Sequence, residues 1–276
     1  FARLPAVFVA TAKSEYVAGH SRLECAIARR ARVTFARDRA TALALSQRGV
    51  NASYAGNVMM DCLVPTSVDL PANGEAIALA VLPGSRSDAG ANARAAARRL
   101  ALIAARANKP VRALVAQARS VETQTIIDAF ADAGLTLHPT GQVTGITARG
   151  AGDRIDVYVA RDATGDVLRS ATIVLGQAGT GNEQAAGLGK PVIAAAQAGE
   201  SPQTVGWYRM RQQKLLGDAL LVVDADDDAF AREVLLLLND PARMARMAAA
   251  GKERMGGTGA AAIIAQAAIA VARGRL

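Results

Sequence analysis

The sequence predicts an α/β fold in which a parallel sheet is covered by helices on both faces. From Ile77 onward, short apolar runs alternate with longer segments that have a helical pattern. The apolar runs are continuous and rich in Val, Ile and Leu, as expected for strands buried on both faces. Regular alternation of strands and helices favours right-handed crossovers between parallel strands. A doubly wound, Rossmann-like domain satisfies both patterns.

The expected elements follow from these runs in chain order. Strands are predicted at 77–82, 111–118, 154–160, 172–178, 191–196 and 219–224. Helices are predicted near 88–107, 121–133, 163–169, 181–189, 203–216 and 226–239. Two more helices follow, in PARMARMAAAGKERMG and GAAAIIAQAAIAVARG, and the GGTG between them is a natural helix end and hinge.

The chain has 276 residues, enough for one large domain or two ordinary ones, and the pattern favours two. Residues 1–62 are interpreted as the C-terminal part of an N-terminal Rossmann-like domain. Residues 63–75, with two prolines and an Asn-Gly, are interpreted as a linker. Residues 76–255 form the second doubly wound domain, and 256–276 a C-terminal helix that could pack back on the first.

Composition narrows the function classes. The chain is 51% hydrophobic and 4% aromatic, with a formal net charge of +8, two cysteines and no ligand-like cysteine spacing. These features favour a reducing cytoplasm and no metal site. We expect no signal peptide, and no apolar stretch of the length, about 18 residues, that a membrane helix requires. The positive charge fits nucleic acid, an anionic membrane surface, an anionic metabolite or simply solvated Arg-rich faces.

The first candidate site is the turn Pro83-Gly84-Ser85-Arg86, which directly follows a predicted strand. Ligands of open α/β sheets bind outside the carboxyl ends of strands. Gly84 allows close approach of backbone N–H groups, Ser85 offers a hydroxyl, and the Arg86 guanidinium suits phosphate oxygens. From the turn alone, a phosphate cradle and an ordinary strand-to-helix turn with Asp88 near the helix start both remain open.

The second candidate site follows the predicted strand at 172–178. Gly179 and Gly181 permit a tight turn, and Thr180 can cap the next helix or bind an anion. Glu183 and Gln184 lie near the start of that helix, where a carboxylate could meet two sugar hydroxyls. A capped helix between strands is the structural alternative.

Three segments carry a resemblance to a known family: LPGSR (82–86), AGTGNEQAAGLGKPV (178–192) and YAGNVMMD (54–61). Together they resemble the motif set of lipid-A-disaccharide synthase and its uncharacterised relatives, which are nucleotide-sugar glycosyltransferases of GT-B fold. The segment GNEQAAGLGKPV is also similar to that of UDP-N-acetylglucosamine 2-epimerases, which share the fold. The match covers nearly the whole chain.

The resemblance implies two Rossmann-like domains, with the nucleotide held by the C-terminal one. It places the diphosphate against Gly84, Ser85, Arg86, Gly179, Thr180 and Gly181. The ribose position of the family falls on Gln184, a departure from the usual Glu, with Glu183 one residue earlier. Further candidates are Pro202, Gln203 and Thr204 as sugar or phosphate contacts, and Gly56 and Asn57 at the hinge beside the cleft.

The resemblance leaves the catalytic base unassigned. The chain starts at Phe1 without a Met, and we expect roughly another hundred residues before it to complete an N-terminal domain. By the resemblance, the base lies there. The two histidines, His20 and His138, are interpreted as structural or solvated.

The leading hypothesis is an inverting glycosyltransferase that moves a sugar, of acylated glucosamine type, from a UDP-sugar to a lipid-linked sugar acceptor. No cofactor is expected beyond the UDP-sugar donor substrate. The predicted location is the cytoplasm, with peripheral contact to the inner face of the cytoplasmic membrane left open. A UDP-sugar 2-epimerase is the alternative within enzymes. A non-enzymatic, basic nucleic-acid-binding protein is the second alternative, but it does not explain the glycine turns.

Overall fold

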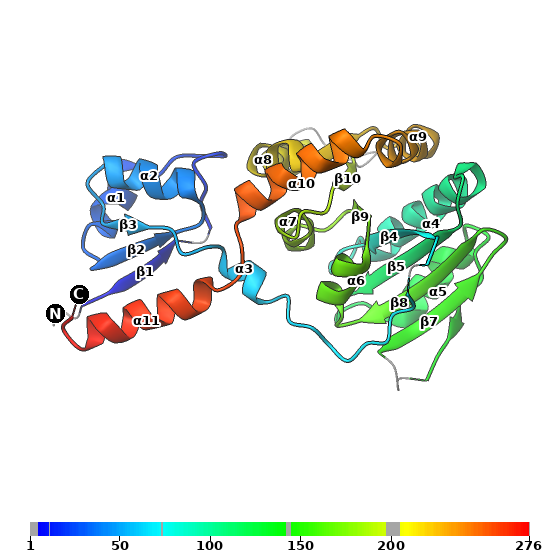
Figure 1. The fold of residues 1–276 in the computed structure, drawn as a ribbon, viewed down its shortest axis with the longest axis horizontal. Coiled ribbons are helices and arrows are strands. Elements are labelled where there is room, and N and C mark those ends of the chain that lie inside the picture. Colours follow the sequence, from blue (N-terminus) through cyan, green and yellow to red (C-terminus); the bar gives the residue numbers. More distant parts are fainter. Residues whose placement is uncertain (1–4, 11, 73, 142–144, 197–204, 276) are drawn as a thin grey trace. The chain divides into compact units, whose positions relative to one another are not determined.

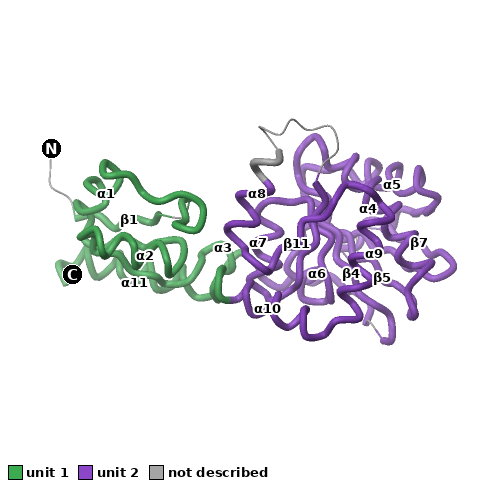
Figure 2. The backbone as a smooth tube through the Cα atoms, turned by 90° about the horizontal axis from the view of Figure 1, so that it is seen from above, with its two compact units in different colours: residues 1–62, 253–276 green, residues 63–252 purple. Residues whose placement is uncertain are grey.

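The structure is a computed structural model, and it describes residues 5–10, 12–72, 74–141, 145–196 and 205–275. The chain divides into two compact units (Figure 2). Unit 1 comprises residues 1–62 and 253–276, so it combines both ends of the chain, and unit 2 comprises residues 63–252.

In the described ranges, unit 2 contains a sheet of eight strands in the order β11-β10-β9-β4-β5-β8-β7-β6. The six strands from β11 to β8 are parallel. The chain forms β4, β5 and β8 in one direction across the sheet and then returns past β4 to form β9. The doubly wound fold is therefore confirmed, with its topological switch point between β4 and β9. The strands are β4 (Ile77–Leu82), β5 (Val111–Gln117), β6 (His138–Pro139), β7 (Ile146–Ala151), β8 (Ile155–Arg161), β9 (Ile173–Gly176), β10 (Val192–Ala195) and β11 (Leu220–Val223).

Helices cover both faces of this sheet (Figure 1). Alternate strand residues, such as Leu79 and Val81, share a core with the apolar faces of α4, α5 and α9. Their neighbours Ala78 and Ala80 are equally buried and face the other way, because successive strand side chains alternate. A right-handed return crossover places α6 on that second face. The helices are α4 (Ala89–Arg106), α5 (Thr123–Ala131), α6 (Thr164–Ser170), α7 (Thr180–Gly187), α8 (Val205–Leu216), α9 (Asp227–Leu238) and α10 (Pro241–Met255).

A buried ion pair joins α4 to the start of α9. Arg99, 6% exposed, donates from Nε to Asp227 Oδ1 over 2.7 Å and from Nη2 to the Ala225 carbonyl over 3.0 Å. Its guanidinium also lies 4.4 Å from the centre of the Phe230 ring. Burial lowers the pKa of Arg99, and the Asp227 carboxylate opposes that shift. Together with the ion pairs Arg98–Asp227 and Arg106–Asp228, this contact joins two helices on one face.

The edge strands β6 and β7 were not predicted. β7 pairs antiparallel with β8, with a register shift between Ile146 and Ala148, and β6 pairs antiparallel with β7. The sequence ITARGA of β7 lacks the continuous apolar run that identified the other strands. Only its first half is buried, so the strand has no apolar run of full length.

The start of the segment predicted as a linker, 63–75, belongs to unit 2 and contacts α6. Thr66 donates to Asp166 Oδ2 twice, from its N–H over 3.0 Å and from Oγ1 over 2.8 Å. The Leu63 carbonyl accepts from Arg169. The prolines thus mark an irregular strap rather than a free tether.

Unit 1 contains a parallel sheet of three strands in the described residues, in the order β1-β2-β3. Three of its helices start with side-chain caps: a capping box of Ser21 and Glu24, the carboxylate of Asp38, and the amide of Asn57. Asp61 accepts hydrogen bonds from the N–H groups of Gly259 and Ala261 at the start of α11, which contacts β1 and α3. The elements are β1 (Val7–Ala10), α1 (Arg22–Ala28), β2 (Val33–Ala36), α2 (Arg39–Gln47), β3 (Ala52–Ser53), α3 (Val58–Asp61) and α11 (Ala260–Ala272).

One region, Pro241–Ala272, contains an 18-residue window with a mean hydropathy of 1.6, long and apolar enough by composition to cross a membrane. The expectation that no such stretch exists is therefore wrong. Only 17% of the window is buried. Residues 256–259, however, split the region into α10 and α11, and α11 with 13 residues is about 20 Å long against the roughly 30 Å of a bilayer core. Length and composition alone do not assign the region to a membrane.

We predict that Gly251→Ala destabilises unit 2. A Cβ on Gly251 would lie 2.2 Å from the Ala186 carbonyl oxygen of α7, so α10 must shift away. The overpacking cost, about 1–3 kcal/mol, outweighs the gain of roughly 1 kcal/mol from replacing a helical glycine. Thermal unfolding should show a Tm lowered by several degrees. Gly141→Ala is the control, because its Cβ would meet nothing within 4 Å; an equal Tm for both variants would refute the packing argument.

Candidate functional site

The two predicted glycine turns lie next to each other at the switch point of unit 2. Leu82, the last residue of β4, pairs with Gly176, the last residue of β9. The Gln177 N–H then donates to the Leu82 carbonyl over 2.9 Å. Both strands end at this point, so the turns at 83–86 and 178–181 share one stretch of the sheet's carboxyl edge.

The turn after β4 is supported from behind by two side chains. Asn92 donates from Nδ2 to the Pro83 carbonyl over 2.9 Å, and Ser120 donates from Oγ to the Ser85 carbonyl over 2.9 Å. Gly84 has φ +98°, in the left-handed region that favours glycine, and a Cβ there would meet nothing within 4 Å. The glycine is therefore required by the backbone conformation, and the space around it is open.

Arg86 is the free cation of this turn. Its side chain is exposed, and in the described part of the chain it makes no hydrogen bond or ion pair. In particular, it is not paired with Asp88, which precedes α4 without capping it through its side chain. The start of α4, an 18-residue helix, thus offers uncapped N–H groups beside an unengaged guanidinium.

The turn after β9 is shaped by close packing. A Cβ on Gly176 would lie 2.1 Å from Asn182 Oδ1, and one on Gly181 would lie 3.1 Å from a Leu82 methyl group. Gly179, with φ −84° and ψ −85°, precedes α7 without a side-chain cap. Within the described ranges, the N–H groups of Gly179 and Thr180 donate to no acceptor. The turn therefore leaves two backbone donors available.

A polar network under this turn was missed by sequence reasoning. Arg209 and Gln212 of α8 are buried, 5% and 4% exposed, and Asn182 of α7 is fully buried. Arg209 donates from Nη1 to Gln212 Oε1 over 2.7 Å and from Nη2 to Gln177 Oε1. Gln212 donates from Nε2 to the carbonyls of Gly179 over 3.0 Å and Ala178 over 3.4 Å. The spacing of Arg and Gln by three residues on a helix was the signal available in the sequence.

Asn182 completes the network from α7. Its Nδ2 donates to the Gly176 carbonyl and to Gln212 Oε1, each over 3.1 Å. Gln177 also donates from Nε2 to the Ala195 carbonyl at the end of β10, over 3.3 Å. The network therefore ties the ends of β9 and β10 to α7 and α8, which lie side by side (Figure 1, Figure 2).

The two ribose candidates differ in exposure. Gln184 is 9% exposed and lies among buried residues of α7, whereas Glu183 is half-buried. Glu183 is therefore better placed to meet a ligand. Lys190, in the same motif, donates from Nζ to the carbonyls of Arg169 over 2.8 Å and Ala171 over 2.7 Å, and burial lowers its pKa. That lysine has a structural role before β10.

The remaining predicted residues lie elsewhere. Pro202, Gln203 and Thr204 lie outside the described residues. Gly56 and Asn57 belong to unit 1, where Asn57 accepts from the Met59 N–H over 3.1 Å, and their role at a cleft stays a prediction. His138 is exposed on β6, and His20 is half-buried in unit 1. The described residues hold no group of three or more potential metal ligands.

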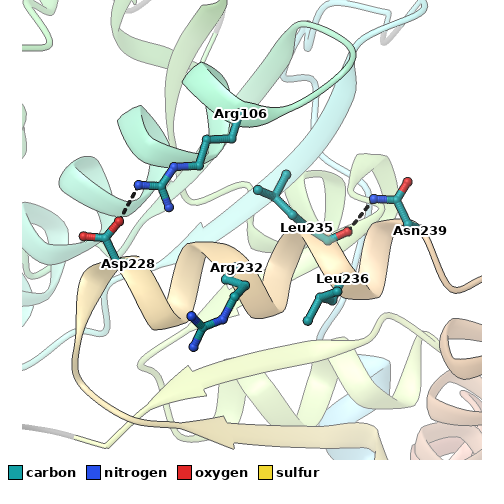
Figure 3. Close-up of a pocket in the computed structure, with 6 residues that line it drawn as sticks. All are labelled: Arg106, Asp228, Arg232, Leu235, Leu236 and Asn239. Atoms are coloured by element: carbon teal, nitrogen blue, oxygen red, sulfur yellow. Dashed lines mark hydrogen bonds and ion pairs between the residues drawn. The ribbon is translucent and has the colours of Figure 1, made fainter.

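A hollow on the helical layer of unit 2 is a weaker candidate (Figure 3). It has a volume of about 280 Å³ and lies on α9 and the end of α4. In Figure 3, Arg106 and Asp228 bond to each other across it, and Asn239 Nδ2 donates to the Leu235 carbonyl over 2.8 Å. The side chains of Arg106, Asp228 and Asn239 are thus engaged in bonds within the protein. The lining residues are Arg106, Asp228, Arg232, Leu235, Leu236 and Asn239.

No protein-family model and no curated protein matches the sequence. Among solved structures, the chain is similar to a Listeria monocytogenes protein assigned as a UDP-N-acetylglucosamine 2-epimerase, at 17% identity and a TM-score of 0.59, covering 90% of this chain and 61% of that one. It is similar to S. aureus MnaA in a co-structure with UDP, at 13% identity and a TM-score of 0.57, covering 99% and 69%. It is also similar to Acinetobacter baumannii MurG, at 12% identity and a TM-score of 0.52, covering 95% and 66%.

These similarities show the fold. The chain resembles GT-B proteins, among them nucleotide-sugar epimerases and MurG, and it spans 61% of the length of the Listeria protein. The expected α/β fold with parallel, Rossmann-like sheets is confirmed. The finer likeness to lipid-A-disaccharide synthase rests on the sequence motifs alone.

We predict non-additive effects of substitutions at Gly176 and Asn182. Gly176→Ala brings a Cβ against the Asn182 side chain, and Asn182→Ala removes two buried hydrogen bonds, each change costing about 1–3 kcal/mol. In the double variant the clash is absent, so its loss of unfolding free energy should fall short of the sum by roughly 0.5–3 kcal/mol. Urea unfolding of the four proteins measures this difference. If the losses of unfolding free energy in the two single variants simply add up in the double variant, the Asn182 side chain is not the reason why residue 176 is a glycine.

Proposed function

We propose that unit 2 binds a UDP-sugar at the switch point and that the protein is an inverting glycosyltransferase with a lipid-linked sugar acceptor. One observation supports the binding step above the others. Two glycine turns at neighbouring strand ends present free N–H groups, and the exposed Arg86 beside them has no described partner. Backbone donors, a helix start and a guanidinium together suit a diphosphate.

The chemistry of UDP as a leaving group fits these donors. When the bond between the sugar C1 and the UDP oxygen breaks, negative charge develops on the diphosphate. The Gly179 and Thr180 N–H groups and Arg86 would stabilise that charge without a metal ion. The acceptor hydroxyl would attack C1 from the opposite side, and its proton must pass to a base that the residues of unit 2 do not supply in our assignment.

Glu183 is our candidate for the ribose hydroxyls. A carboxylate accepts two hydrogen bonds from a diol with charge-assisted strength, whereas a buried amide at Gln184 has less freedom to do so. The lipid-linked acceptor and a peripheral position on the inner face of the cytoplasmic membrane belong to the same proposal. Both are motivated by the resemblance to lipid-A-disaccharide synthase.

A UDP-sugar 2-epimerase is the second candidate, favoured by the segment GNEQAAGLGKPV and by the solved structures. One of these, from Neisseria meningitidis, is a UDP-GlcNAc 2-epimerase bound to UDP-GlcNAc, at 14% identity and a TM-score of 0.54. An epimerase would invert C2 of the same donor and would use the same diphosphate site. The two functions differ in whether an acceptor is required.

We predict that UDP-GlcNAc is consumed only when a glycolipid acceptor is added. A transferase releases UDP and extends the acceptor. Without an acceptor, water is the only nucleophile that could take the sugar. An epimerase converts the donor alone to its C2 epimer and incorporates deuterium from D₂O at C2. Mass spectrometry and NMR of the donor, with and without an acylated glucosamine phosphate acceptor, distinguish the two. Deuterium incorporation without acceptor would replace the transferase proposal by the epimerase one.

We predict that Arg86→Ala weakens UDP binding and leaves uridine binding nearly unchanged. The guanidinium would contact phosphate oxygens only, and losing a charge-assisted contact costs about 1.5–3 kcal/mol, or roughly ten- to a hundredfold in Kd. Calorimetric titration of both ligands measures the difference. Arg94→Ala, on the exposed face of α4 where Arg94 pairs with Asp132, is the matched control.

Two results would contradict this assignment. Equal weakening of UDP and uridine would make the turn structural. Thermal stabilisation by a nonspecific oligonucleotide but not by UDP, at physiological salt, would favour the nucleic-acid alternative. A net charge of +8 would then be explained by binding to the phosphate backbone.

A further inference from the structure

In the network under the second glycine turn, Arg209 determines how the neighbouring amide side chains are oriented. A guanidinium only donates hydrogen bonds, so any amide that faces it must present its oxygen. Arg209 meets the oxygens of both Gln177 and Gln212. An amide side chain could otherwise turn over by 180° at little cost, because its two ends have nearly the same shape.

Fixing the Gln212 oxygen also fixes its nitrogen. With Oε1 held by Arg209 Nη1 and by Asn182 Nδ2, Nε2 points at the turn and donates to the carbonyls of Ala178 and Gly179. In the opposite orientation, the amide oxygen would face those carbonyl oxygens and repel them. Arg209 thus selects the one orientation in which α8 holds the turn.

Holding the carbonyls determines where the N–H groups of the turn point. In a trans peptide plane the C=O and N–H bonds point in opposite directions. The Ala178 carbonyl is held toward α8, so the Gly179 N–H points away from α8. The Gly179 carbonyl accepts from Gln212 Nε2 and also from the N–H groups of Asn182, over 3.1 Å, and Glu183, over 3.4 Å, at the start of α7. Helices α8 and α7 therefore direct the Thr180 N–H together. The Gly179 and Thr180 N–H groups are the two donors that the described chain leaves without an acceptor.

We propose that Arg209 is a positioning residue for phosphate recognition. By orienting the Gln177 and Gln212 amides, it holds the turn so that the Gly179 and Thr180 N–H groups converge on a nucleoside diphosphate. The inference rests on the proposed function, since UDP is the anion in question. The inference goes beyond the proposed function because it assigns part of the affinity for UDP to a buried side chain on α8 that does not contact the ligand.

The experiment compares two equally buried arginines of unit 2. Arg209→Met removes the guanidinium that bonds to the oxygens of Gln177 and Gln212, although Asn182 still donates to Gln212. Arg99→Met removes one of the ion pairs between α4 and α9. We expect both variants to unfold at lower temperature. Only Arg209→Met should weaken UDP, by about tenfold or more, because turn donors that are no longer preorganised bind less tightly. Uridine affinity should stay within about twofold in both variants.

A second measurement needs no ligand. Backbone ¹⁵N relaxation of the free protein should show lower order parameters for Gly179 and Thr180 in Arg209→Met, and unchanged values in Arg99→Met. Arg209→Lys should restore part of both effects, because an ammonium group still donates to amide oxygens. If Arg209→Met does not fold, Gln212→Leu removes the amide that donates directly to the Ala178 and Gly179 carbonyls and should reproduce the loss.

The outcomes separate the two proposals. Equal effects of the two methionine variants on UDP affinity, or unchanged order parameters at the turn, would overturn the positioning role. If the wild-type protein does not bind UDP at all, the proposed function fails, and the order parameters still decide whether Arg209 holds the turn.

Discussion

The structure of unit 2 depends on one topological constraint, the return of the chain past β4 after three parallel strands. Because crossovers between parallel strands are right-handed, reversing direction across the sheet places the next helix on the other face. The reversal leaves two neighbouring strands, β4 and β9, whose connections leave the sheet on opposite sides. In doubly wound folds this edge is where ligands bind, and the two turns lie there.

The two turns at this edge are stabilised in different ways. The first is held by side chains of its own half of the domain, Asn92 and Ser120, and keeps Arg86 free. The second is held from below by α8, an element that follows it by about 25 residues in the sequence. A βα turn with a structural role needs only a capped helix. Here neither α4 nor α7 has a side-chain cap, and the polar groups are used beneath the turn instead. This arrangement differs from that of ordinary strand-to-helix connections and is the reason for proposing an anion site here.

Glycines in the motif GTGNEQAAGLGKPV have separate physical reasons. Gly181 leaves room for Leu82, and Gly189 has φ +72° in the left-handed region after α7. Near the end of the motif, Lys190 donates hydrogen bonds to two carbonyl groups at the end of α6. Much of the motif that carries the resemblance therefore encodes the packing of α7, and only its first residues face the edge. A motif match of this kind is for that reason stronger evidence for fold than for substrate.

The sequence by itself determined the parallel strands and their order of appearance, because continuous apolar runs between helical segments have few other solutions. It also determined that turns with glycine follow β4 and β9. The tertiary structure alone decided that these turns are neighbours, since strand order depends on which edges pair. It also decided that Arg209, Gln212 and Asn182 meet under the second turn: their burial comes from the docking of α8 on α7, which no local pattern encodes. The antiparallel edge formed by β6 and β7 was hidden for the same reason, because a half-buried strand acquires its partner only when the sheet is assembled.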